Sequence, residues 1–205
     1  MEHQQTGKRS IALPITLVIL VFSLIGNVLL YTLYLQHKQE ASFETGQKIY
    51  KAAVESKLYF GELISQMDEL LNSKQAEDRL EAKYFSGRAA VLSSGVIELI
   101  AQADRISTSD NKLSPEPALL FINHVDFSMQ QVGSYDGPLK DEDRTYLLSL
   151  KRAFEQMADE LSGFNTNLAD NRSAIIRLSS GLDWVEHVER LYQLMNEQPV
   201  KHPAA

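Results

Sequence analysis

Histidines and carboxylates are the side chains of this sequence that could carry acid–base or metal chemistry. The histidines are His3, His37, His124, His187 and His202. In "NHVD" (123–126), His124 and Asp126 are two residues apart, which places them on different faces of a helix. In "EHVE" (186–189), the two glutamates share a face and His187 points away from them. A metal site inside a helical bundle needs Glu-x-x-His motifs on facing helices, so this spacing indicates no metal site.

The sequence does not indicate a serine-based or cysteine-based catalytic site either. The motif "LSSG" occurs at 92–95 and at 178–181, without the strained G-x-S-x-G turn that an exposed serine nucleophile requires. The chain has no cysteine, which excludes disulfides, thiol catalysis and Cys-type zinc sites. Paired carboxylates on acidic helices are typical of solvated faces. We therefore expect no catalytic, cofactor-binding or metal site, no cofactor, and no enzyme activity.

The elements that would position any site differ sharply along the chain. The 205 residues are 44% apolar and 23% charged, with a net charge of −7, and this acidic balance disfavours nucleic acid as a partner.

The stretch "IALPITLVILVFSLIGNVLLYTLYL", from Ile11 to Leu35, carries no charge. As a helix it is roughly 37 Å long, enough to cross a hydrocarbon core of about 30 Å. It is longer than a signal-peptide core and its exit shows no cleavage site, which predicts a retained signal anchor.

The flanks of this apolar segment predict its orientation. Lys8 and Arg9 precede it, and positive residues favour the cytoplasmic side. Tyr31 and Tyr34 lie near its other end, where aromatic rings favour the membrane interface. We expect residues 1–10 to be cytoplasmic and the remainder extracytoplasmic, in a single-pass protein of a bacterial cytoplasmic membrane.

Heptad spacing dominates the sequence that follows the apolar segment. Nine positions with a strict 3–4 alternation form the first seam: Phe43, Gly46, Tyr50, Ala53, Lys57, Phe60, Ile64, Met67 and Leu71. Only Lys57 clearly breaks it, and a lysine can extend its charge to water. Further helices are predicted over about 76–106, 116–132, 141–161 and 173–196, and no strand-like alternation appears. In the second of these helices, Gly87 and Gly95 either weaken the helix or let a neighbouring helix approach closely.

The predicted fold is therefore all-α. It consists of a transmembrane helix over 11–35 and an extracytoplasmic helical bundle of about four to five helices over 38–196, with a flexible tail over 197–205. The heptad seams are typical of a coiled coil. They favour closure of the bundle within one chain and also allow a homodimer.

One stretch resembles a known family. Residues 121–161 are similar to the N-terminal helical region of the spore-germination protein YpeB family. The likeness is carried by Phe121, Asp126-Phe127-Ser128, Pro138-Leu139, the Leu147/Leu150 seam and Glu160-Leu161. Asp170-Asn171, Ile175-Ile176 and Val188-Glu189 add to it. The PepSY-type C-terminal half of that family has no counterpart in this sequence.

Two hypotheses for function follow. The resemblance implies a role in bacterial sporulation or spore germination, in which a membrane-anchored helical protein supports a cell-wall (cortex-lytic) enzyme by protein–protein interaction. The alternative is an extracytoplasmic sensory or ligand-binding helical module that works with a signalling partner. Under both hypotheses the partners are the lipid bilayer and a protein that the sequence does not identify.

Overall fold

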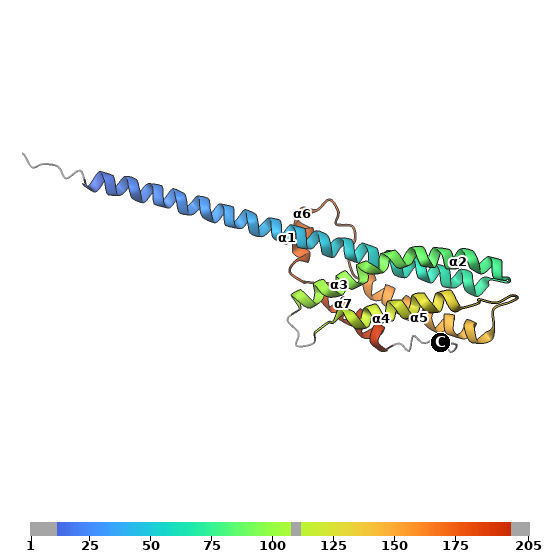
Figure 1. Ribbon diagram of the computed structural model, residues 1–205. Coiled ribbons are helices and arrows are strands. Elements are labelled where there is room, and N and C mark those ends of the chain that lie inside the picture. The colour runs from blue at the N-terminus through green and yellow to red at the C-terminus, as the bar shows by residue number, and fades with distance from the viewer. Residues whose placement is uncertain (1–11, 108–111, 198–205) are drawn as a thin grey trace, which may run out of the picture. The chain divides into compact units, whose positions relative to one another are not determined.

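The computed structural model describes residues 12–107 and 112–197, and every regular element in these ranges is a helix. The elements are α1 (Ala12–Asn72), α2 (Ala76–Ala89), the short 3-10 helix η1 (Ala90–Leu92), α3 (Ser93–Ile106), α4 (Pro115–Gln131), α5 (Asp141–Ser162), α6 (Arg172–Leu178) and α7 (Val185–Glu197) (Figure 1). The predicted all-α class is confirmed for this part of the chain. The chain divides into two units after Ala41, and each is described by itself.

The first unit consists of the beginning of α1. Pro14 lies in the first turn of this helix, where its missing N–H interrupts no intrahelical hydrogen bond. From Pro14 to Glu40 almost every side chain is exposed. No described residue outside α1 belongs to this unit. The unit therefore has no protein core of its own.

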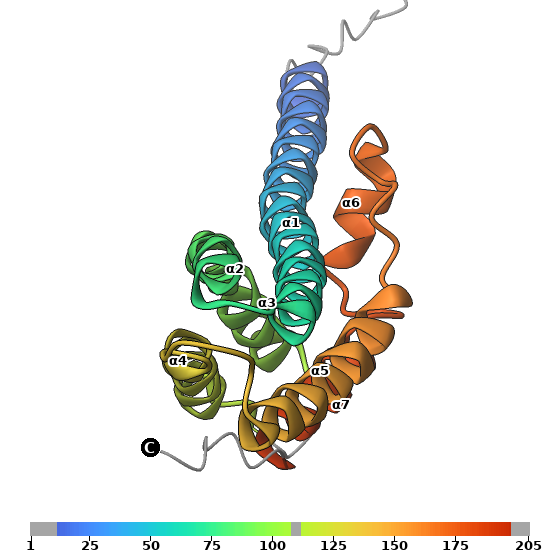
Figure 2. The same cartoon turned by 90° about the vertical axis from the view of Figure 1, so that its right-hand side faces the viewer.

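The second unit is built on the remainder of α1. All nine predicted seam positions between Phe43 and Leu71 are buried or half-buried. A second row along the same helix, with Ile49, Tyr59 and Leu63, is fully buried as well. Helices pack on more than one side of this stretch, as Figure 2 shows. The heptad spacing thus predicted the buried positions correctly, although the buried face is broader than a coiled-coil seam.

Aromatic rings from three helices meet in the core of the second unit. The centroid of Phe154 on α5 lies 5.4 Å from that of Phe60 and 6.1 Å from that of Tyr59, both on α1. Phe121 on α4 stacks on Phe154 at 6.0 Å. Burial of such a ring contributes about 2–3 kcal/mol, so this cluster is a main source of the packing energy that joins α1, α4 and α5.

Two glycines allow close helix packing. A Cβ atom at Gly95 on α3 would lie 2.5 Å from the Cβ of Glu55 and 2.9 Å from the carbonyl oxygen of Ala52 on α1. A Cβ at Gly46 on α1 would collide with the backbone carbonyl of Ile175 on α6. The expectation of close approach is confirmed for Gly95. Gly87 does not support this alternative, because it faces open space apart from the side chain of Gln130 at 3.9 Å.

The predicted last helix over 173–196 is wrong in one respect, because the structure breaks it into α6 and α7. Gly181 and Asp183, between the two helices, have positive φ angles of 77° and 70°. Such angles end a right-handed helix. The indole N–H of Trp184 donates to the carbonyl oxygen of Leu178 at 2.9 Å, which closes the turn.

Candidate membrane anchor and interaction sites

The apolar segment of the first unit is the first candidate site. Its large apolar side chains are exposed throughout, for example Phe22 at 70% and Leu30 at 67%. Among the described residues, one helix is long and apolar enough to cross a membrane, and none of its most apolar window is buried. A signal sequence near the N-terminus has the same properties. By length and composition, the segment therefore fits a hydrocarbon environment better than water.

The predicted residues of this site fall in two groups. Tyr31, Tyr34 and Leu35 are exposed on α1, where the sequence analysis places the outer end of the segment. Ile11, Lys8 and Arg9 lie outside the described residues. The roles of all six residues remain predictions.

The second unit brings charged side chains together at one place that sequence spacing did not indicate. Glu160 on α5 accepts a hydrogen bond from Nε of Arg190 on α7 at 2.8 Å, and its carboxylate lies 3.3 Å from Nδ1 of His187. The hydrogen bond from Arg190 is the main reason that the pKa of Glu160 lies below its usual range. His187 does point away from Glu186 and Glu189, but its partner comes from another helix. No cluster of three or more metal-ligating side chains occurs within 12–107 and 112–197.

A buried arginine holds the turn between α4 and α5. Arg79 on α2 is 1% exposed, and its guanidinium donates to the carbonyl oxygen of Gly133 at 2.9 Å and to that of Tyr135 at 2.5 Å. Asp143 on α5 accepts from the N–H of Gly133 and from the hydroxyl of Tyr135. The turn has the sequence "GSYDGP" (133–138), and its arginine partner lies more than fifty residues away along the chain. This network is structural, because its hydrogen bonds join α2, the turn and α5; the Nη1 atom of Arg79 is buried and has no hydrogen-bond partner among the described residues.

The loop between α5 and α6 is held by side chains of α1. The ammonium group of Lys57 donates to the carbonyl oxygen of Phe164 at 2.6 Å. The hydroxyl of Tyr50 donates to the carbonyl oxygen of Thr166 at 3.0 Å. Partial burial lowers the pKa of Lys57. The two polar positions of the first heptad seam therefore bind a loop.

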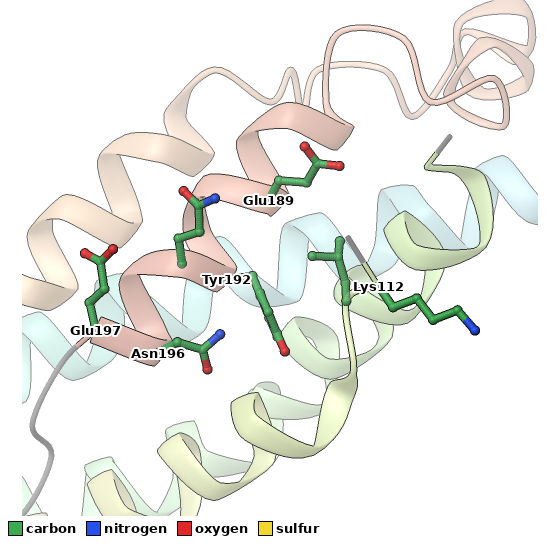
Figure 3. A pocket seen from close by; sticks show the side chains of 7 residues that line it. Lys112, Glu189, Tyr192, Asn196 and Glu197 are labelled. Carbon is green, nitrogen blue, oxygen red and sulfur yellow. The ribbon is translucent and has the colours of Figure 1, made fainter. Parts of the chain in front are cut away.

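Two hollows in the second unit could hold a small molecule. One of about 420 Å³ lies beside α7 and is lined by Lys112, Tyr192, Asn196 and neighbouring residues (Figure 3). Its lining mixes polar and apolar surface and is open to solvent, and it contains no histidine. The other, of about 220 Å³, is lined by Phe164, Leu168 and Trp184, among others. An ion pair between Arg177 and Asp183, 2.7 Å apart, adjoins these apolar walls.

One carboxylate of the second unit has a strongly altered pKa. Partial burial of Asp126 on α4 raises its pKa to about 6. The charge of Asp126 in turn helps burial to raise the pKa of Tyr59. The hydroxyl of Tyr59 is buried and has no hydrogen-bond partner among the described residues. Because no nucleophile or metal ligand set accompanies this pair in the described structure, we interpret it as a feature of packing and stability.

Comparison with known proteins found no matching family model, no matching curated protein and no matching solved structure. The resemblance to the YpeB family therefore stays a prediction.

Proposed function

We propose that this chain is a single-pass membrane protein that holds a helical domain at the outer face of a bacterial cytoplasmic membrane and works there by protein–protein contact. The observation that carries the proposal is the contrast within α1. Residues 14–35 expose an uncharged apolar surface, whereas residues 42–72 bury most of their apolar side chains in a protein core. Lys8 and Arg9 support a cytoplasmic N-terminus.

A surface on α4 supports the contact function. Leu120 and Phe127, seven residues apart, are each 53% exposed, and Leu119 is 48% exposed. Apolar side chains at this spacing share one helix face. Phe127 also belongs to the stretch that resembles the YpeB family. That resemblance makes a cortex-lytic enzyme the first candidate for the partner.

Cell fractionation and protease access test the anchor. The full chain with a C-terminal tag should stay in the membrane pellet after carbonate extraction. Protease added to intact protoplasts should remove the tag. A chain found in the soluble fraction, or a tag that resists external protease while an extracytoplasmic control protein is cleaved, would contradict the proposal.

Site-specific photo-crosslinking tests the contact. A photoreactive phenylalanine analogue at position 127 should cross-link in cells to one discrete protein. The same analogue at the exposed position of Asp159, on α5, serves as the matched control and should not. If the product from position 127 is a peptidoglycan hydrolase, the role implied by the resemblance is supported. No product, or the same products from both positions, would count against a specific partner on α4.

A sensory module is the second candidate, because of the hollow beside Trp184. Apolar walls with a nearby ion pair suit a small ligand that has an apolar body and a charged group. Since Trp184 is the only tryptophan, its fluorescence reports on this hollow directly. A small carboxylate or amine that raises the unfolding midpoint and shifts the Trp184 emission in the wild type, but not in Leu168→Phe, which narrows the hollow without adding a second tryptophan, would favour this function.

A further inference from the structure

The hollow beside Trp184 combines apolar walls with two opposite charges. Its walls include the buried side chains of Phe164, Leu178 and Trp184. Arg177 and Asp183 also line it and form an exposed ion pair, in which Nη2 of the arginine lies 2.7 Å from Oδ2 of the aspartate. A ligand in this hollow therefore meets apolar surface and both charges together.

The turn between α6 and α7 holds the parts of this site in place. The indole N–H of Trp184 donates to the carbonyl oxygen of Leu178, so the ring is fixed and its polar atom is already used. The ring of Phe164 lies edge-on to the indole, with the centroids 6.3 Å apart. Asp183 has a positive φ of 70°, a conformation that aspartate adopts more readily than most residues. Walls that are positioned before a ligand arrives lower the cost of binding it.

The size of the hollow suits one apolar side chain. Its volume is about 220 Å³. An apolar cavity of about 150 Å³ holds a benzene molecule, so this hollow has room for the side chain of leucine, methionine or phenylalanine as a free ligand. Leu182 also lines the hollow and is 58% exposed. A ligand that covers Leu182 gains binding energy from the apolar surface removed from water.

The ion pair decides which charges the ligand should carry. A carboxylate that binds Arg177 is repelled by Asp183, because the two side chains touch, and an ammonium group that binds Asp183 is repelled by Arg177 in the same way. A ligand with both groups pairs with both side chains. Its two charges should lie close together, as they do on a single α carbon. Opening the ion pair costs little, because exposed ion pairs contribute little to stability.

A side-chain amide in the lining offers a further donor. The amide oxygen of Asn165 accepts from the N–H of Asn167 at 2.9 Å. Its NH₂ group has no hydrogen-bond partner among the described residues. This group is therefore available to donate to the carboxylate of a ligand.

We propose that the hollow beside Trp184 binds an apolar α-amino acid, with its side chain against Phe164 and Trp184, its carboxylate at Arg177 and its ammonium group at Asp183. This inference rests on the second candidate function, the sensory module, and names the class of its ligand. It does not depend on the contact surface of α4, because no residue of that helix lines the hollow.

Ligand binding by the full chain in lipid nanodiscs tests the class. L-leucine, L-isoleucine, L-methionine and L-phenylalanine are titrated by calorimetry and by the emission of Trp184, the only tryptophan. At least one of them should bind and shift the emission. Its amide, which lacks the carboxylate, and its N-acetyl derivative, which lacks the ammonium group, should each bind about tenfold more weakly or worse. Glycine has both charges without a side chain and should also bind weakly.

Charge variants test the two residues. Asp183→Asn keeps a residue type that tolerates a positive φ. It should weaken the amino acid about tenfold and, because the repulsion is gone, let the N-acetyl derivative bind about as tightly as the amino acid. Arg177→Gln should do the same for the amide. Asp159→Asn and Arg152→Gln, matched changes at exposed positions of α5, should leave both affinities unchanged.

Failure of this inference can be told apart from failure of the sensory function. The inference is overturned if none of the four amino acids binds, if a derivative with one charge binds as tightly as its parent, or if both charge variants bind like the wild type. If another small carboxylate or amine then shifts the Trp184 emission, the sensory function stands with a ligand of another class. If no compound does, both fail. An unfolding midpoint close to that of the wild type, measured for each variant without ligand, shows that lost binding is not lost folding.

Discussion

Two stretches of α1 have opposite surroundings although they belong to one uninterrupted helix. Between residues 14 and 35 the apolar side chains are exposed, with Phe22 at 70%. Between residues 42 and 72 most apolar side chains are covered, and Phe60 is fully buried, whereas Leu58 is exposed. The first stretch is apolar all round, whereas the second carries charges on one side and apolar residues at heptad spacing on the other. Periodicity, more than total hydrophobicity, thus distinguishes the stretch that lies in a protein core from the stretch whose apolar side chains are exposed.

The largest expected contrast between the two stretches concerns their phenylalanines. Phe60→Ala removes a ring from the centre of the aromatic cluster, and we expect a loss of about 3–5 kcal/mol in the free energy of unfolding of the second unit. Phe22→Ala, in the first stretch, should change it by less than about 0.5 kcal/mol. Denaturant titration of the full chain in detergent, followed by the fluorescence of the buried Trp184, measures both. Equal losses would show that the two stretches do not differ in packing.

A pair of glycines gives the next contrast. Gly46→Ala would drive a methyl group into the backbone of Ile175, and we expect a loss of about 1–3 kcal/mol. Gly26→Ala, where nothing lies within 4 Å, should leave the unfolding of the second unit unchanged. The same Trp184 titration compares them. A neutral Gly46→Ala would mean that α6 can move away from α1 at little cost.

The charge of Asp126, which faces Tyr59 on the second stretch, should make stability depend on pH. Because its pKa rises from 3.8 to about 6 on folding, the folded state binds the proton more tightly. Its contribution is therefore least favourable above pH 6, and stability from this group increases as the pH falls towards 4. Asp126→Asn should add about 1–2 kcal/mol at pH 8, after allowance for partial exposure, and much less at pH 4. Thermal unfolding at the two pH values measures this, with Asp159→Asn as an exposed control; an equal gain at both would contradict it.

The smallest contrast concerns tyrosine hydroxyls. Tyr50→Phe removes the hydrogen bond to the carbonyl of Thr166, and we expect a loss of about 1 kcal/mol. Tyr31→Phe, in the first stretch, should have no effect on the unfolding of the second unit. The unfolding midpoint of each variant is compared with that of the wild type under identical conditions, which shows whether either hydroxyl contributes to stability. If Tyr50→Phe is as stable as the wild type, water replaces the lost donor and the loop does not depend on it.

The local sequence pattern predicted most of the helices but little of the turns and contacts that join them. The heptad positions of α1 and the acidic first turn of α5 are local signals, and the structure agrees with both. The break between α6 and α7 was missed because Leu178, Leu182 and Val185 continue a helical spacing. Gly181 and Asp183 are residue types that adopt positive φ angles more readily than others, but this weak signal was overlooked beside the helical spacing.

Contacts between distant parts of the chain could not be predicted from the sequence either. The carbonyls that accept from Arg79 and Lys57 belong to loops whose side chains give no indication of these bonds. The contact of His187 with Glu160 likewise joins two helices whose relative rotation the sequence does not specify. Leu80, Tyr84 and Val91, within the predicted helix over 76–106, are exposed. No local signal says what covers such residues.

The bonds from Lys57 and Tyr50 to the α5–α6 loop end on main-chain oxygens. Every amino acid offers the same acceptor, so Thr166 could be exchanged for many other residues while the attachment persists. Selection would then act on the two donors and leave the residue types of the loop free to diverge. The side chains of the α5–α6 loop could therefore change during evolution while the loop stays attached to α1.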